Sequence, residues 1–125
     1  MVSKQTIRFI IISIIILAMF GIFKKLLGGS INDQQLKEVI HQNAFLVDVR
    51  TPGEFTSGSA KGAVNIPLDR LENQLEKFKG KENIIVFCKS GNRSGQAKRI
   101  LEKNNFRNVI NGGSWQNVQT LLNEK

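Results

Sequence analysis

The run Ile84-Ile-Val-Phe-Cys-Lys-Ser-Gly-Asn-Arg-Ser-Gly95 joins a short apolar segment to a glycine- and serine-rich turn, with the chain's only cysteine, Cys88, between them. The apolar residues predict a buried strand, and helical spacing follows the turn. In open α/β sheets, ligand sites lie at the carboxyl ends of strands. The N-terminus of a helix adds free N–H groups and a positive partial charge. We therefore expect Cys88 to be exposed, thiolate-prone and nucleophilic.

The segments around this run alternate between strand and helix patterns. Strands are predicted over 45–49, 63–66, 83–87 and 107–110, and helices over 32–42, 68–78, 94–104 and 114–122, with a brief helix that starts at the Thr51 cap and Pro52. Strands that alternate with helices at this spacing indicate a parallel sheet. The predicted fold class is α/β, a small parallel sheet of four to five strands flanked by helices on both faces, preceded by one N-terminal hydrophobic helix.

The N-terminal part of the chain has a different composition. Phe9 to Phe23 carry no charge, and Arg8, Lys24 and Lys25 flank them. A cleaved signal peptide, an uncleaved anchor and a buried core helix are the alternatives. We favour a transmembrane or signal-anchor helix over 1–27, because no small-residue cleavage site follows the apolar run. Residues 28–30 form a predicted linker, and 31–125 a single domain.

The flanking charges predict where this domain lies. They slightly favour a cytoplasmic N-terminus, which would make the protein a single-pass membrane protein with an extracytoplasmic domain. The formal net charge of +8 fits attraction to a membrane surface, or simply a lysine-rich solvated surface. Nucleic acid is a poor fit as a partner, because basic residues are scattered without an aromatic-basic motif.

Cysteine content limits the chemistry of the chain. A single cysteine excludes an intramolecular disulfide and a multi-cysteine zinc site. We expect neither a metal nor a cofactor.

Four motifs, taken together, resemble the single-domain rhodaneses, a family of sulfurtransferases. Asp48-Val-Arg-Thr-Pro-Gly-Glu-Phe55 and Gly62-Ala-Val-Asn-Ile-Pro67 are similar to the two signatures of the family. Cys88-Lys-Ser-Gly-Asn-Arg93 resembles its Cys-x-x-Gly-x-Arg active-site loop, and Gly112-Gly-Ser-Trp115 its late Gly-Gly-Trp region. One departure is Gly58-Ser-Ala60, where family members often have Gly-His-Ile. His41 is therefore the only histidine, and a histidine base for Cys88 is not expected.

The resemblance implies transfer of a sulfane sulfur by Cys88. The thiolate would take sulfur from a small anionic donor such as thiosulfate, and a thiol or cyanide would remove it. The implied substrate-binding residues are Lys89, Ser90, Gly91, Asn92, Arg93 and Ser94, with Asp48 and Arg50 in support. The loop N–H groups would surround the outer sulfur and stabilise the persulfide anion.

Several side chains have two possible roles. Arg93 would hold the donor or brace the loop. Ser94 would donate to the sulfur or, as we favour, cap the following helix. Asp48 and Arg50 fit an ion pair better than catalysis, and Glu54 an acid at the start of a helix. Trp115 and Phe87 fit core positions.

Two other functions remain open at this point. Cysteine phosphatases use a Cys-x5-Arg loop, and the four residues between Cys88 and Arg93 form a ring better suited to one sulfur atom. A non-catalytic binding module is the other alternative, and the intact loop argues against it. The physiological donor, the acceptor and the oligomeric state are not indicated by the sequence.

Overall fold

The structure is a computed structural model that describes residues 3–14 and 31–124. The chain divides into two units, Met1–Ile31 and Asn32–Lys125. In the first unit, residues 4–14 are helical. The second unit contains the sheet and the cysteine loop, and its elements are described next. The predicted linker at 28–30 lies outside the described residues.

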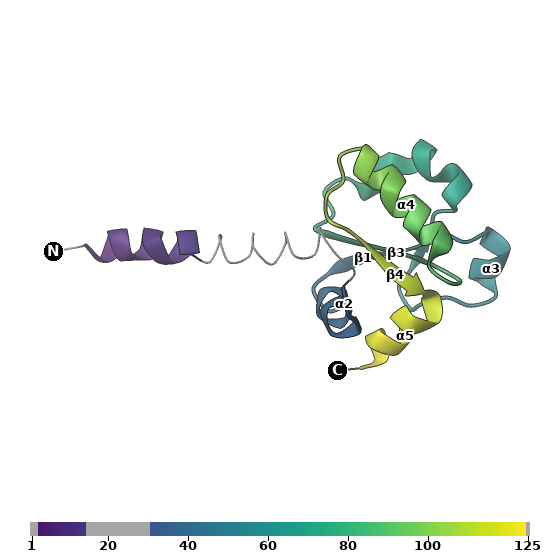
Figure 1. Cartoon of the computed structure of the whole chain (residues 1–125), viewed down its shortest axis with the longest axis horizontal. Coiled ribbons are helices and arrows are strands. Elements are labelled where there is room, and N and C mark those ends of the chain that lie inside the picture. The colour runs from purple at the N-terminus through teal and green to yellow at the C-terminus, as the bar shows by residue number, and fades with distance from the viewer. Residues whose placement is uncertain (1–2, 15–30, 125) are drawn as a thin grey trace. The chain divides into compact units, whose positions relative to one another are not determined.

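Four parallel strands form the sheet, as the sequence predicts. They are β1 (Ala44–Asp48), β2 (Val64–Asn65), β3 (Asn83–Cys88) and β4 (Val109–Ser114), in the order β2-β1-β3-β4. Figure 1 shows β1, β3 and β4 side by side at the centre of the domain. The order places β1 and β3 in the middle, so the carboxyl ends of these two strands lie next to each other. Asp48 and Cys88 end these strands.

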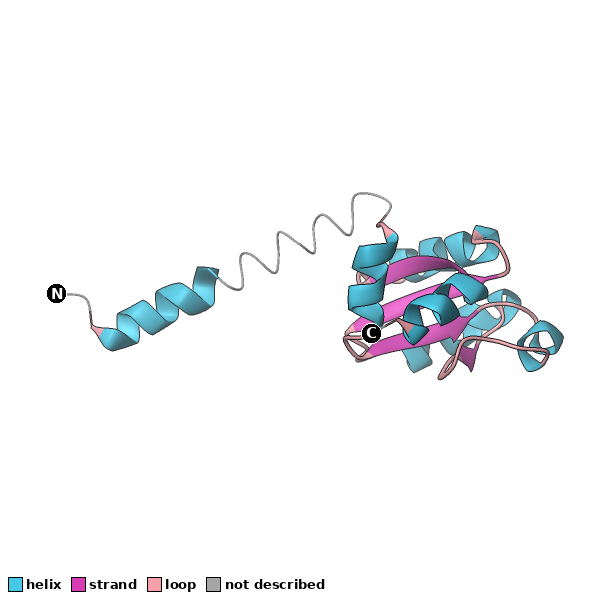
Figure 2. Cartoon of the chain, turned by 90° about the horizontal axis from the view of Figure 1, so that it is seen from below, coloured by secondary structure: helices cyan, strands magenta, loops and turns pink. Residues whose placement is uncertain are grey.

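Helices cover both faces of the sheet. α2 (Asp33–Ile40) and α5 (Trp115–Asn123) pack together on one face, and α4 (Asn92–Lys103) and η1 (Leu68–Phe78) on the other. The short helix α3 (Pro52–Thr56) follows β1. Figure 2 shows the strands enclosed between helices, which confirms the predicted α/β architecture.

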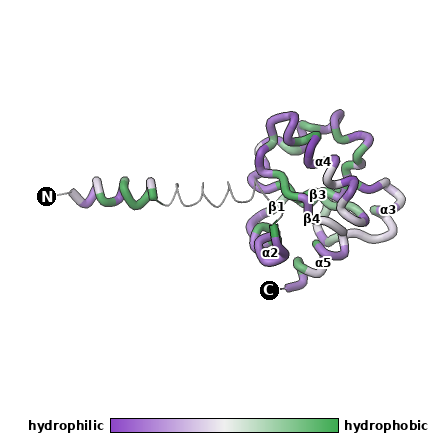
Figure 3. Tube along the Cα trace, viewed as in Figure 1, coloured by the Kyte–Doolittle hydropathy of each residue, from purple (hydrophilic) through white to green (hydrophobic). Residues whose placement is uncertain are grey.

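Successive side chains of β3 point to opposite faces of the sheet. Ile84, Val86 and Cys88 point toward the face that α4 covers, where they pack with Ala97 and Leu101 of that helix. The residues between them, Ile85 and Phe87, are fully buried on the opposite face. Figure 3 shows β1 as largely hydrophobic and much of the α2 and α4 trace as hydrophilic. Cys88 thus occupies the last inward position of a core strand.

Two of the differences from the predicted elements concern η1 and β4. The segment Leu68–Phe78 is a 3₁₀-helix interrupted at Gln74 (φ −128°, ψ 26°). Its apolar pairs at i and i+3, Leu68 with Leu71 and Leu75 with Phe78, suit turns of three residues on each side of the break.

The other difference is the length of β4. It continues through Gly112 and Gly113, beyond the predicted end at Ile110, and a register shift between Val86 and Cys88 of β3 inserts one extra residue into β4.

The prediction of a single-pass membrane protein is wrong. No helix within 3–14 and 31–124 is long and apolar enough to cross a membrane. The helical stretch over 4–14 has eleven residues, which span about 16 Å, against a hydrocarbon core of roughly 30 Å. The predicted extracytoplasmic side is withdrawn with it. The remainder of the predicted span, 15–27, lies outside the described residues.

Candidate active site

Cys88 stands where β3 meets α4, at the carboxyl end of the sheet. Gly91 is the N-cap of α4, with φ 96°, a conformation that favours glycine. α4 begins at Asn92, two residues before its predicted start. Asn92, Arg93 and Ser94 therefore belong to the first turn of the helix, and the loop proper is Lys89 to Gly91.

The thiol of Cys88 faces hydrogen-bond donors from this turn. The Gly91 N–H donates to Sγ at 3.0 Å, and Ser94 Oγ lies 3.4 Å from Sγ. Burial raises the pKa of the Cys88 thiol, but hydrogen bonds from the Ser94 side chain and from the backbone of Ser94, Ser90 and Gly91 outweigh it, so the net pKa is lowered. The thiolate is thus favoured by neutral donors.

The expectation that Cys88 is exposed is wrong. The residue is only 1% exposed, because it closes a core strand beneath the first turn of α4. A reagent or donor must therefore enter the loop to reach the sulfur. A lowered thiol pKa and surface exposure, which often occur together in reactive cysteines, are separated in this site.

Ser94 is fully buried and does not cap α4. Its hydroxyl lies 2.7 Å from Oδ1 of Asn111 as well as near the sulfur. Asn111, in β4, also donates through Nδ2 to the carbonyl of Gly91 at 2.9 Å. The bonding role that we considered second for Ser94 is the one that the geometry favours.

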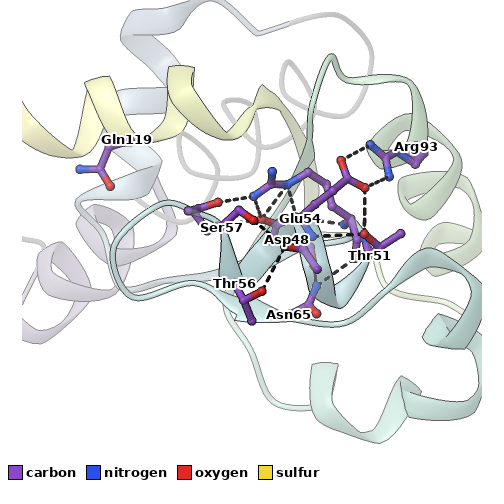
Figure 4. Close-up of polar contacts among 12 residues, drawn as sticks. Asp48, Thr51, Glu54, Thr56, Ser57, Asn65, Arg93 and Gln119 are labelled. Atoms are coloured by element: carbon purple, nitrogen blue, oxygen red, sulfur yellow. Dashed lines mark hydrogen bonds and ion pairs between the residues drawn. The ribbon is translucent and has the colours of Figure 1, made fainter.

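Arg93 forms a bidentate ion pair with Glu54. Nη1 lies 2.7 Å from Oε1 and Nη2 3.0 Å from Oε2 (Figure 4). The Arg93 hydrogen bonds lower the pKa of Glu54 to about 2, and Glu54 in turn raises the pKa of Arg93. Glu54 also completes the capping box of α3 with Thr51. This arrangement favours the bracing role of Arg93 over direct contact with a donor.

Asp48 and Arg50 form the buried ion pair that the sequence indicates. Arg50 Nη2 lies 2.7 Å from Asp48 Oδ2 and also donates to the Gly58 carbonyl at 2.6 Å. Ser59, within the Gly58-Ser-Ala60 departure, donates to Asp48 Oδ2 at 2.7 Å. The guanidinium of Arg50 lies 5.3 Å from the centre of the half-buried Trp115 ring. This network fixes the loop between α3 and β2, and none of its hydrogen bonds reaches the Cys88 sulfur.

The other predicted site residues lie at the surface. Lys89, Ser90 and Asn92 are exposed. The backbone of Ser90 helps to lower the pKa of Cys88, and exposed Lys89 directly follows the cysteine at the rim of the loop. Their roles in substrate binding stay predictions, as do those of the other loop residues.

Sequence reasoning missed two residues of the site. Glu54 was interpreted only as a helix-start acid, and its partner Arg93 is 39 positions away. Asn111 was assigned to no element, because the predicted strand ended at Ile110. Continuing the alternation from Val109 would have placed Asn111 on the α4 side of the sheet, as a polar residue among core positions.

The arrangement favours nucleophilic chemistry at one sulfur atom. Its donors converge on Sγ from a short loop, and the guanidinium groups of Arg50 and Arg93 are held in ion pairs with Asp48 and Glu54. Within the part of the chain that the structure describes, no three histidine, cysteine or acidic side chains gather as metal ligands. His41 Nε2 lies 3.2 Å from the carbonyl of Leu121, in contact with α5.

Comparisons with known proteins agree with this geometry. A model of the rhodanese-like domain matches residues 32–120. The chain is 32% identical over 74 residues to the thiosulfate sulfurtransferase PspE of Escherichia coli, covering 58% of this chain and 71% of that protein. It is 33% identical over 88 residues to a putative mitochondrial thiosulfate sulfurtransferase of Schizosaccharomyces pombe, covering 59% and 62%.

Solved structures show the same fold. A rhodanese-related protein of Thermoplasma volcanium matches with a TM-score of 0.62 at 27% identity, over 77% of this chain and 94% of that one. An E. coli rhodanese with anions matches with a TM-score of 0.55 at 32% identity, over 59% and 89%. The match spans less than two thirds of the length of the S. pombe relative and 56% of YqhL of Bacillus subtilis. The matched model covers well over half of the residues, and the chain belongs to the family of rhodanese-like domain proteins.

Proposed function

We propose that the protein is a sulfurtransferase that carries a sulfane sulfur on Cys88. The observation that carries this proposal is the pair of donors near Sγ, the Gly91 N–H at 3.0 Å and the Ser94 hydroxyl at 3.4 Å, beside a Cys88–Arg93 segment with four residues between its ends. Family relatives named as thiosulfate sulfurtransferases support it.

Two steps complete the proposed reaction. The Cys88 thiolate attacks the outer sulfur of thiosulfate, a sulfur–sulfur bond forms to Sγ, and sulfite leaves with the electron pair of the broken bond. Cyanide or a thiolate then attacks the outer sulfur of the persulfide, and the bond to Sγ breaks with its electron pair returning to Cys88. Charge balances in both steps and no external oxidant is required.

The N-terminus of α4 can stabilise the negative charge of a persulfide intermediate. The positive partial charge at the start of α4 and the N–H groups of the loop stabilise negative charge without a catalytic base. Arg93 is neutralised by Glu54, so attraction of a dianionic donor falls mainly to Lys89 at the exposed rim. The proposed role of Arg93 is to fix the loop by joining α4 to α3.

The test is persulfide formation followed by turnover. We expect thiosulfate to add the mass of one sulfur atom to the intact protein, and cyanide to remove it with release of thiocyanate. Cys88→Ser should show neither event, because an alcohol at this position is not ionised near neutral pH. His41→Gln is the matched control and should keep both, since the His41 ring contacts Leu121 rather than the loop.

Two results would contradict the proposal. One is an unmodified mass after treatment with thiosulfate and with an organic persulfide. The other is hydrolysis of an aryl phosphate that depends on Cys88 in a protein that accepts no sulfur, which would replace sulfur transfer with phosphatase chemistry.

A further inference from the structure

The side chain of Asn111 has only one possible orientation. Its Nδ2 donates to the carbonyl of Gly91 at 2.9 Å, and its Oδ1 accepts from the N–H of Gly113 at 3.0 Å. Exchanging the two atoms would set N–H against N–H and oxygen against oxygen. Oδ1 is therefore fixed, and it is the atom that faces Ser94.

Ser94 has one hydroxyl proton and two acceptors within reach. Asn111 Oδ1 lies 2.7 Å from Ser94 Oγ, and Cys88 Sγ lies 3.4 Å from it. Oδ1 only accepts, so the short contact requires Ser94 to be the donor. While the proton points to Asn111 it cannot serve the sulfur. Ser94 is 0% exposed, so bulk water does not supply a substitute.

We propose that Asn111 is a positioning residue that acts on Cys88 through Ser94, by competing with the sulfur for the single hydroxyl proton. When Sγ is a neutral thiol, Asn111 Oδ1 is the better acceptor and holds the proton. When Sγ is a thiolate, the hydroxyl rotates and donates to the sulfur. The direction of one O–H bond thus follows the charge on Cys88.

The consequence for sulfur transfer rests on the function proposed above. In a persulfide the negative charge lies mainly on the outer sulfur, and Sγ, now bonded to it, is again nearly neutral. The Ser94 proton then returns to Asn111. Asn111 therefore favours the persulfide relative to the free thiolate, and it does so without touching the outer sulfur.

The charged groups around Cys88 belong to other elements and do not change with position 111. β4, over 109–114, has no ionisable side chain. The charged side chains around the site lie on β1 and the turn after it, on α3, in the loop and on α4: Asp48, Arg50, Glu54, Lys89, Arg93 and, beside Asn111 at Gly95, Arg99. A neutral substitution of Asn111 therefore leaves the surrounding charges in place.

The test is a double-mutant cycle on the full-length, reduced protein. The rate of alkylation by iodoacetamide is measured across pH for wild type, Asn111→Ala, Ser94→Ala and the double variant. Below the titration midpoint of Cys88, Asn111→Ala should react about two- to tenfold faster, the equivalent of losing the one hydrogen bond from Ser94 to Asn111 that stabilises the neutral thiol in wild type. Ser94→Ala should react more slowly, and in that background Asn111→Ala should give no acceleration.

The cycle separates competition from loop support. Asn111 also braces Gly91, and loss of that brace would change the rate equally in both backgrounds. An equal change in both, or no change in either, overturns the proposal. Asn111→Asp gives a second measurement of opposite sign: it keeps an acceptor for Ser94 and should slow alkylation more when Ser94 is present than when it is absent. This variant decides the matter if Asn111→Ala does not fold by circular dichroism.

A second arm measures the persulfide directly. At a fixed ratio of thiosulfate to sulfite, Asn111→Ala should hold about two- to tenfold less persulfide relative to thiolate than wild type. Alkylation requires no sulfur transfer. If thiosulfate modifies none of the variants, the proposed function fails while the alkylation cycle still tests the role of Asn111.

Discussion

Replacing Gly91 with alanine tests whether the shape of the loop controls the sulfur. Gly91 has φ 96°, and an added Cβ would lie 3.4 Å from the Cα of Gly113. A left-handed conformation costs an L-residue about 1–2 kcal/mol, and loss of glycine freedom in the unfolded chain returns about 0.4–1 kcal/mol. The contact with Gly113 adds to the cost. We expect Gly91→Ala to be destabilised by about 1–2 kcal/mol.

Two other glycines serve as matched controls for this variant. Gly62 has φ 82° with nothing near its Cβ position, so Gly62→Ala shows the backbone cost alone. Gly53 lies in α3 with neither a positive φ nor a neighbour within 4 Å, and Gly53→Ala should be neutral or stabilising by up to about 1 kcal/mol. Urea unfolding followed by circular dichroism ranks the three variants.

The same variants report on the sulfur. If Gly91→Ala moves the loop to relieve its strain, the Gly91 N–H leaves Sγ, and alkylation of Cys88 below its titration midpoint should slow by about two- to tenfold. Gly62→Ala should alkylate at the wild-type rate. The reasoning is refuted if Gly91→Ala matches Gly62→Ala in both stability and alkylation, because the loop would then control neither.

Further predictions concern the ion pairs and the glycine of β4. The pKa of Glu54 is depressed to about 2, so the ionised carboxylate stabilises the fold above pH 4.5, its ordinary pKa, and this stabilisation is lost as pH falls toward 2. Glu54→Gln should therefore flatten that part of the acid-unfolding curve, and an unchanged curve would contradict this. Asp48→Ala leaves Arg50 buried and unpaired and should cost about 3–5 kcal/mol in urea unfolding; a loss below about 1 kcal/mol would show that Arg50 finds another partner. Gly112→Ala places a Cβ 2.9 Å from Val118 Cγ2 and should cost about 1–3 kcal/mol, with a smaller added cost once Val118→Ala makes room; strictly additive costs would rule out this contact as the cause.

Sequence patterns predicted the sheet and the loop because these depend on local order. The apolar run before Cys88 predicts a buried strand from its own residues, and it forms β3. Gly91 follows Cys88 at the spacing that a tight turn requires. The Thr51 cap and Pro52 similarly predicted the start of α3, which the structure confirms.

The features that the sequence did not predict depend on contacts between segments that are distant in the chain. The spacing within Leu68–Phe78 fits both an α-helix and two short 3₁₀ pieces, and packing selected the second. Glu54 accepts a hydrogen bond from the Thr51 N–H at the start of α3, and this local role explains the residue without any reference to Arg93. The burial of Cys88 follows from α4 beginning two residues early, a shift that sequence spacing does not resolve.

The loop around Cys88 is held from two sides by groups that do not bond the sulfur. From α3, Glu54 fixes Arg93 at the outer end of the ring, and from β4, Asn111 fixes the Gly91 carbonyl at its base. A loop held at both ends keeps its N–H groups aimed inward whether Sγ is a thiol, a thiolate or part of a persulfide. Because these donors are already in place, each change of charge at the sulfur requires little rearrangement. Of the two groups that contact Sγ in the described structure, the Ser94 hydroxyl is the one that can rotate, and it turns between Sγ and Asn111 Oδ1.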